Sequence, residues 1–439
     1  MLIARYLVLI VASIFVISGF GAGIHYWNHQ EKGITAAVGT YKTPEEADAF
    51  VRFVMEGYDI MQTNYWQEAE DKDMSQLFLA SIQKSASSSA TLSSQDRAGV
   101  AKLVAAVIES TPEIERIKIS EAILQVALYN MAPIGRNQLL STAARKELHN
   151  EVLNIHPENN LYKDLGLADG ASPETVQKAY EEKKAELAAS TSPAAALELE
   201  KATYAKNVLT DGSAKSSYDQ TKAEPTVFSR LVNPSTLYVH ITGMSPATQA
   251  EFEGHVKKMI TSSVTSMILD LRGNIGGDLA TAQTFIGLFQ GSNQYAFDFF
   301  NRGAYEDQRT IGIGKLAELL NIRETAILTD GMTQSTAEVI TAAMKKLNLA
   351  YSVGAKTRGW GSIEQILPMR TVIDPNNTHT ILLVVRLTVR DDGQPIEGQG
   401  VVPDFDTSQP DWQSHLGEKF FSKDLIAAIK KSAAEPPQK

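Results

Sequence analysis

The chain has 439 residues, a length that usually divides into two or three domains. Its hydrophobic content of 43% and charged content of 21% are typical of globular proteins and exclude wholesale disorder. The formal net charge of −10 argues against a nucleic-acid partner. The absence of cysteine excludes disulfides, thiolate metal sites and a cysteine nucleophile.

The chain begins with a long apolar segment that has no charge between Arg5 and Glu31. Its run YLVLIVASIFVISGFGAGI is long enough to cross a bilayer of about 30 Å. We therefore expect residues 1–30 to form a transmembrane signal anchor, or a signal sequence cleaved near the small residues 21–23. Arg5 on the short flank predicts a single-pass protein whose body is extracytoplasmic, in the periplasm or outside the cell.

Residues 40–157 are predicted to form a helical domain. Two helix starts are well marked, TPEE at residues 43–46 and TPE at residues 111–113, where a capping threonine precedes a proline and a glutamate. Within residues 50–61, apolar side chains recur at helical spacing. The serine-rich residues 85–94 are predicted to form a loop. This region contains no catalytic cluster, and we expect it to be a scaffold.

The next segment, residues 158–222, contains YKDLGLADGASPETVQKAY and then NVLTDGSAKSSYD. These stretches resemble the opening, second and closing helices of a J domain. The His-Pro-Asp tripeptide that a J domain uses to stimulate its chaperone ATPase is absent, because residues 188–190 are Ala-Ala-Ser, and the His-Pro-Glu at 156–158 precedes the module. We therefore expect a three-helix spacer or substrate-docking module, and no chaperone ATPase partner.

From residue 226 onward, strands alternate with helices, which predicts an α/β domain over residues 226–427. Residues 428–439 are predicted to be a flexible tail. Within the domain, the expected strands are residues 236–241, 267–271, 325–329 and 380–389, and the expected helices are residues 246–262 and 336–347.

Four blocks of this domain carry a family resemblance. They are LYVHITGM (237–244), MILDLRGNIGG (267–277), AILTDGMTQSTAEVI (326–340) with VGAKTRGWGSIEQILP (353–368), and LTVRDDGQPIEGQGVVPD (387–404). In this order, residues 236–406 resemble the catalytic domain of the tail-specific, or C-terminal processing, serine proteases. The resemblance implies a fold like that of crotonases and Clp-type proteases, and a polypeptide substrate or ligand.

The resemblance places Ser335 at the nucleophile position, at the start of a helix whose unpaired N–H groups and partial positive charge favour an alkoxide. It implies oxyanion donors at the backbone amides of Gly276 and Thr336, with Gly277 as the alternative to Gly276 and a substrate-binding neighbour. Glu338 matches a family glutamate and is expected to anchor the helix. The competing interpretation of Ser335 is a plain helix-capping serine.

The family's catalytic base is a glycine-flanked lysine, and Trp360 stands at that position. An indole has a donor N–H but no basic lone pair, so it cannot accept the serine proton. The supporting glutamine is also changed, because Glu364 occupies its register. A carboxylate base there would need its pKa raised by desolvation. Lys356 is a second substitute base, but four extended residues separate it from the lysine position by about 13 Å.

Other catalytic arrangements find little support. No histidine can be placed for a serine-histidine-carboxylate triad like that of the related tricorn-type proteases, and His240 is expected to face away from Ser335. The PDZ domain that family members use to hold a substrate's carboxylate is replaced by the J-like module. No motif indicates a metal or nucleotide, and we expect no cofactor.

We therefore predict a multi-domain chain with a transmembrane helix, a helical N-terminal domain, a J-like insert and a crotonase/Clp-like α/β protease core. Three functions stay open. The first is a serine endopeptidase that acts on C-terminal regions, and the second is a pseudopeptidase that binds such segments as a scaffold or adaptor. The third, for which the sequence offers least, is a co-chaperone acting through the J-like module.

Overall fold

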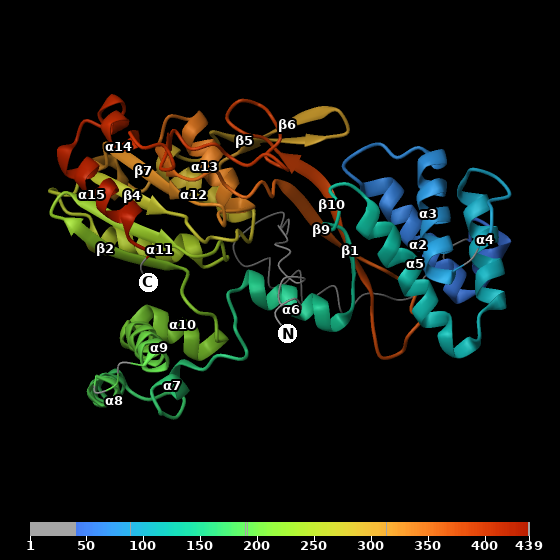
Figure 1. The fold of residues 1–439 in the computed structure, drawn as a ribbon, viewed down its shortest axis with the longest axis horizontal. Coiled ribbons are helices and arrows are strands. Elements are labelled where there is room, and N and C mark those ends of the chain that lie inside the picture. Colours follow the sequence, from blue (N-terminus) through green and yellow to red (C-terminus); the bar gives the residue numbers. More distant parts are fainter. Residues whose placement is uncertain (1–40, 88, 189, 191, 313, 438–439) are drawn as a thin grey trace.

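The computed structural model describes residues 41–437, except residues 88, 189, 191 and 313. The expected anchor at residues 1–30 lies outside this part of the chain. Within the described residues, no helix is both long enough and apolar enough to cross a bilayer. Figure 1 shows an α/β body at one end, a helical bundle at the other end, and a smaller helical module beside the body.

The N-terminal helical bundle packs on the end of a long β-hairpin. Ile381 and Leu383 of that hairpin belong to the same buried cluster as Phe53, Phe78 and Leu124 of the bundle. α3 continues to Ala86, so the predicted serine-rich loop begins after it. The bundle consists of η1 (Pro44–Ala47), α2 (Ala49–Asn64), α3 (Asp71–Ala86), α4 (Arg97–Ser110), η2 (Glu113–Glu115) and α5 (Arg116–Asn130).

A short strand, β1 (Gln138–Leu140), and helix α6 (Thr142–Val152) connect the bundle to the following module. β1 pairs antiparallel with β10, with Leu139 opposite Ile381. Three residues are too few to give a periodic pattern, which is why the sequence did not predict this strand. The Ser141 side chain accepts a hydrogen bond from the Ala144 N–H and so starts α6.

The J-like module is a separate helical unit with its own buried cluster, which includes Tyr162, Val176 and Tyr218. The predicted closing helix over residues 207–219 is wrong in one respect. The chain breaks at Asp211, whose side chain accepts from two N–H groups and begins a new helix, so there are four helical segments rather than three. They are α7 (Leu161–Asp164), α8 (Pro173–Leu187), α9 (Pro193–Thr210) and α10 (Gly212–Thr221). Residue 189, in the register of the missing tripeptide, lies outside the described residues.

The body is built on a six-stranded sheet in the order β11-β8-β7-β4-β3-β2. All neighbouring pairs are parallel except β2 with β3. Parallel strands need crossover connections, which the alternating helices supply. The strands are β2 (Val227–Asn233), β3 (Thr236–Ile241), β4 (Ser266–Asp270), β7 (Glu324–Thr329), β8 (Tyr351–Gly354) and β11 (Phe405–Asp406).

A second, antiparallel sheet has the order β1-β10-β5-β6, and β9 also pairs with β10. The β9–β10 hairpin is the long one that reaches from the body to the helical bundle in Figure 1. The ladder between them shifts register between Val384 and Arg386. The remaining strands are β5 (Tyr295–Asn301), β6 (Ala304–Arg309), β9 (Ser362–Pro368) and β10 (Thr380–Thr388).

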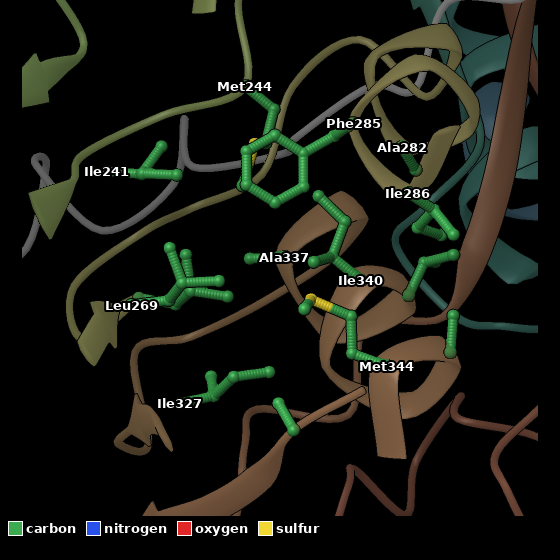
Figure 2. Close-up of a cluster of buried hydrophobic side chains, with 14 of the residues drawn as sticks. Ile241, Met244, Leu269, Ala282, Phe285, Ile286, Ile327, Ala337, Ile340 and Met344 are labelled. Carbon is green, nitrogen blue, oxygen red and sulfur yellow. The ribbon is translucent and has the colours of Figure 1, made fainter. Parts of the chain in front are cut away.

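Helices cover the six-stranded sheet and bury its apolar side chains. Figure 2 shows Phe285 of α12 and Ile340 and Met344 of α13 packed beside Leu269 and Ile327 of the sheet. Burial of each such side chain contributes roughly 1.5–3 kcal/mol before conformational entropy is counted. The helices of the body are α11 (Thr248–Met259), α12 (Ala280–Gln290), η3 (Ala317–Asn321), α13 (Thr336–Lys346), α14 (Trp412–His415), η4 (Leu416–Glu418) and α15 (Lys423–Ala434).

The predicted flexible tail from residue 428 is wrong over most of its length. α15 continues to Ala434, and Ala428 and Ile429 are buried in a cluster with the sheet. The Arg272 guanidinium donates hydrogen bonds to the carbonyls of Ser432 and Glu435. The tail's sequence is dominated by small and charged residues, so its docking depended on partners far away in the chain.

Candidate active site

Ser335 stands at the N-terminus of α13, where the loop after β7 enters the helix. Its backbone angles are φ 54° and ψ −126°, a conformation that non-glycine residues rarely adopt. The Ser335 N–H donates to Glu338 Oε2 at 3.0 Å, and the two residues form a capping box over the first turn. Ser335 is 3% exposed. Ser335 is therefore a buried residue with a strained backbone at the start of a helix.

The glycine turn after β4 lies directly against Ser335. A Cβ on Gly276 would come within 2.6 Å of the Ser335 Cβ, and φ at this position is +91°. The Gly276 N–H, however, donates to the Asn274 side-chain oxygen at 2.8 Å. In this conformation the Asn274 side chain therefore occupies the Gly276 N–H, and the role of Gly276 as an oxyanion donor stays a prediction.

Gly277 and Thr336 retain the geometry expected of oxyanion donors. The Thr336 hydroxyl donates to the Gly277 carbonyl at 2.9 Å, which joins the two segments side by side. Among the described residues, no acceptor contacts the backbone N–H of either residue. A Cβ on Gly277 would lie 2.3 Å from the Met244 carbonyl, so a larger residue does not fit. The alternative donor, Gly277, fits this structure better than Gly276.

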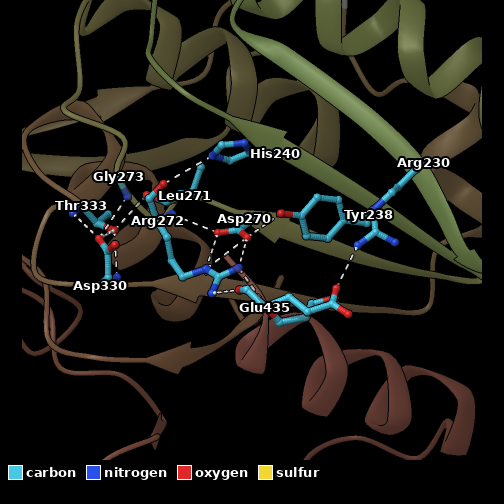
Figure 3. A network of polar contacts seen from close by, with 11 residues as sticks. Arg230, Tyr238, His240, Asp270, Leu271, Arg272, Gly273, Asp330, Thr333 and Glu435 are labelled. Carbon is cyan, nitrogen blue, oxygen red and sulfur yellow. Dashed lines mark hydrogen bonds and ion pairs between the residues drawn. The ribbon is translucent and has the colours of Figure 1, made fainter. Parts of the chain in front are cut away.

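A buried polar network positions the glycine turn and the loop before Ser335 (Figure 3). Asp270 is 0% exposed and accepts from the Tyr238 hydroxyl at 2.6 Å and from the Arg272 guanidinium. Asp330 accepts from the Gly273 N–H at 3.1 Å, and the Thr333 hydroxyl donates to the Leu271 carbonyl at 2.8 Å. A buried charge is stable only with such partners, so the network fixes both loops in one arrangement.

Glu338 joins the start of α13 to the segment that carries Trp360. Its Oε1 accepts from the Thr357 hydroxyl and the Gly359 N–H, and its Oε2 accepts from the Ser335 and Trp360 N–H groups. Burial raises the pKa of Glu338, although these hydrogen bonds act in the opposite direction. Because the N–H groups of Ser335 and Trp360 lie within 3.0 Å of one oxygen, Trp360 stands beside the nucleophile position.

Two guanidinium groups lie over the Trp360 indole ring. The Arg136 Cζ is 3.9 Å from the ring centroid, and the Arg358 Cζ is 5.0 Å from it. Arg136 comes from the segment after the helical bundle and also forms an ion pair with Glu397 at 3.1 Å. Two cations therefore lie beside Trp360, the residue at the position expected for the family's lysine.

The two substitute bases predicted from the sequence, Lys356 and Glu364, differ in burial. Lys356 is exposed, while the next residue, Thr357, turns inward to Glu338. Glu364 is 1% exposed in β9, and its Oε1 accepts from the Ser362 hydroxyl at 2.7 Å. His240 is 4% exposed, with its ring Nε2 3.4 Å from the Arg272 carbonyl.

Two acidic residues near the glycine turn were missed in the sequence. Burial raises the pKa of Asp278 to about 6, and Asp278 directly follows the glycine pair. Burial also raises the pKa of Glu151 to about 7, and Glu151 lines a pocket together with Gly276 and Gly277. The position of Asp278 next to the glycines was a usable signal. Glu151 lies far away in the sequence and offered none. In the described part of the chain, no cluster of side chains suits a metal ion.

Comparisons with known proteins assign part of the α/β body to a peptidase family. Residues 235–407 match the model of peptidase family S41. The chain is 26% identical over 189 residues to the carboxy-terminal processing protease CtpA of Bacillus subtilis, covering 43% of this chain and 38% of that protein. It is 24% identical over 192 residues to a carboxy-terminal-processing protease of Bartonella bacilliformis, covering 43% and 41%. The chain thus spans less than half the length of these curated relatives.

Similar solved structures include a photosystem II D1 C-terminal processing protease, at 12% identity and a TM-score of 0.45, covering 82% of this chain and 93% of that chain. A lipoprotein from Streptococcus agalactiae is 16% identical with a TM-score of 0.45, covering 87% and 100%. Similarity at this level is too weak to carry an argument about function.

Proposed function

From the premise that residues 235–407 form a domain of peptidase family S41, we propose that this chain binds extended or C-terminal polypeptide segments through that domain without cleaving them. The relatives that carry this domain are named as C-terminal processing proteases, which supports a polypeptide ligand. The proposal assigns Ser335 to the nucleophile position and Trp360 to the position of the missing base.

The contacts of Trp360 are the observation that supports this proposal most directly. Its N–H is fixed to Glu338 Oε2 at 2.8 Å, beside Ser335, and its ring is stacked against Arg136 and Arg358. An indole accepts no proton, and guanidinium groups are always protonated. A serine hydroxyl is a weak nucleophile at neutral pH unless a base removes its proton. Neither the indole nor the two guanidinium groups over it can therefore take the place of the family's lysine as proton acceptor.

A serine endopeptidase is the second candidate function. Two observations favour it. Ser335 has a strained backbone, and strain of this kind is found most often at catalytic positions. In the described part of the chain, no acceptor contacts the N–H groups of Gly277 and Thr336. A peptidase would need another residue to act as the base. It would also need a conformational opening that exposes Ser335 to substrate, because Ser335 is only 3% exposed. The binding function needs only that opening.

The test uses the full chain and casein, an unfolded protein. Wild type and the Ser335→Ala variant should both bind casein and leave it intact over hours. Trp360→Lys should cleave it, since the neighbouring guanidinium groups would lower the pKa of the new lysine and favour its neutral, basic form. Degradation by wild type but not by Ser335→Ala would refute the binding function in favour of the peptidase. Failure of all three proteins to bind casein would refute both.

We also propose a location for the protein, which depends on residues 1–30. We assign them to a membrane anchor with the body extracytoplasmic, on the strength of the uncharged run after Arg5. Full-length protein should sediment with membranes, and a variant that begins at residue 31 should not. Equal distribution of the two proteins would refute the anchor.

A further inference from the structure

A small pocket adjoins the glycine turn on the side of the connecting helix α6. It lies between the C-terminal end of α6, the segment that follows β3, and the turn itself. Gly276 belongs both to this pocket and to the contact with Ser335 described above. The pocket is lined by Leu148, Glu151, Val152, Asn154, His156, Thr226, residues 242–245 and residues 275–277.

The pocket combines apolar walls with one carboxylate. Leu148 and Val152 of α6 and Met244 and Ile275 of the body supply the apolar surface. Glu151 is partly buried, and its carboxylate makes no hydrogen bond or ion pair that involves a described residue. A buried carboxylate usually has a partner, because desolvation makes an unpaired charge costly. That cost is the reason the pKa of Glu151 is raised to about 7.

The surroundings of Glu151 favour a positive ligand. Glu151 lies in the last turn of α6, at the end of a helix that carries partial negative charge. No lysine or arginine is among the lining residues. The other ionisable residue of the lining, His156, is bonded to Asn154 Oδ1 at 3.1 Å and lies 3.9 Å from a Glu158 oxygen. The described lining therefore holds a carboxylate and a helix C-terminus, and its charge is not balanced by a fixed cation.

We propose that this pocket is a subsite for a lysine or arginine side chain of the bound polypeptide, with Glu151 as its counter-charge. The inference rests on the proposed function, since it needs a polypeptide lying along the glycine turn. The aliphatic stem of the basic side chain packs between Val152 and Met244, and its cationic head pairs with the Glu151 carboxylate. The arrangement gives the domain a preference for basic sequences that no residue of the α/β body supplies alone.

The test compares peptides that differ in one side chain. Ten-residue fluorescein-labelled peptides carry a single lysine at successive positions, and a matched set carries norleucine, which has a similar stem and no charge. Binding of each peptide to the full chain is measured by fluorescence polarisation at pH 8. Wild type should bind the lysine peptide about tenfold more tightly than its norleucine partner at one position of the set.

The variant Glu151→Gln should lose this preference and keep the affinity for the norleucine peptide. Glu147→Gln is the matched control, because Glu147 is an exposed glutamate one turn earlier on the same helix. Glu151→Lys should reverse the preference toward a glutamate-containing peptide. Equal binding of lysine and norleucine peptides by wild type, or an equal loss of both in Glu151→Gln, would overturn the subsite alone. Absence of binding by every peptide would overturn the proposed function itself.

Discussion

Replacing Glu338 with glutamine tests whether one buried carboxylate holds the base position against the nucleophile position. The carboxylate accepts four hydrogen bonds, two on each oxygen, from Thr357, Gly359, Ser335 and Trp360. A glutamine amide has one oxygen and one NH2 group. Whichever way it is oriented, two of the four donors lose their acceptor.

The size of the effect follows from these contacts. A hydrogen bond to a charged group contributes about 1.5–3 kcal/mol, so losing two costs roughly 3–6 kcal/mol. Relief of the buried charge offsets part of this, since burial disfavours the ionised carboxylate. We expect a net loss of about 3 kcal/mol in the free energy of opening this region. That corresponds to roughly a hundredfold faster hydrogen exchange at the Ser335 and Trp360 amides.

The measurement is native-state hydrogen exchange by mass spectrometry on peptides that contain residues 335 and 360. The control is Glu174→Gln, which changes an exposed glutamate in the first turn of α8, two residues after the N-cap Ser172, whereas Glu338 lies three residues after Ser335. Faster exchange confined to Glu338→Gln would support the linkage. Unchanged exchange in that variant, equal to the control, would refute the reasoning.

Three further predictions concern neighbouring residues. Gly276→Ala should lower the free energy of unfolding in urea by about 2–4 kcal/mol, and Gly273→Ala by about 1 kcal/mol. Both glycines have positive φ, but only at Gly276 would a Cβ meet a neighbouring atom within 4 Å. Equal losses in the two variants would contradict this prediction. Burial raises the pKa of Glu151 from 4.5 to about 7, so the folded chain binds the carboxyl proton more tightly than the unfolded chain does. The stabilisation from this proton is complete below pH 4.5 and is lost as the pH rises through 7. Glu151→Gln should therefore be about 1–2 kcal/mol more stable than wild type at pH 8 and equal to it at pH 4.5, and a pH-independent difference would refute the assignment. Arg136→Ala removes both the stacking on Trp360 and an ion pair, and should cost about 2 kcal/mol in the same assay, with no loss arguing against this contact.

The fold was predictable where local pattern and long-range packing agree. The strand over residues 236–241 and the helix beginning at residue 336 appear as β3 and α13, because their apolar periodicity faces a core that buries it. Elements that depend on distant partners were missed or misjudged. β1 exists only because β10 offers a free edge, and the tail joins α15 because the Arg272 guanidinium reaches its carbonyls.

For the candidate site, motif spacing predicted the segments that meet but not their hydrogen bonds. Ser335, the glycine turn and Trp360 are brought together as the spacing implied. The loss of the Gly276 N–H to the Asn274 side chain depends on the rotamer of one residue, which sequence does not encode directly. Glu151 and Arg136 reach the site from elements outside the α/β body, so no local pattern could reveal them.

The most direct test of the central claim is labelling by a fluorophosphonate, which reacts with a serine hydroxyl only when a base activates it. Wild-type full chain should remain unlabelled, Trp360→Lys should be labelled, and the label should vanish when Ser335→Ala is added to Trp360→Lys. The labelled variant is essential, because the burial of Ser335 alone would also keep wild type unlabelled. Labelling of wild type that is abolished by Ser335→Ala would contradict the account, since some other group would then be serving as the base.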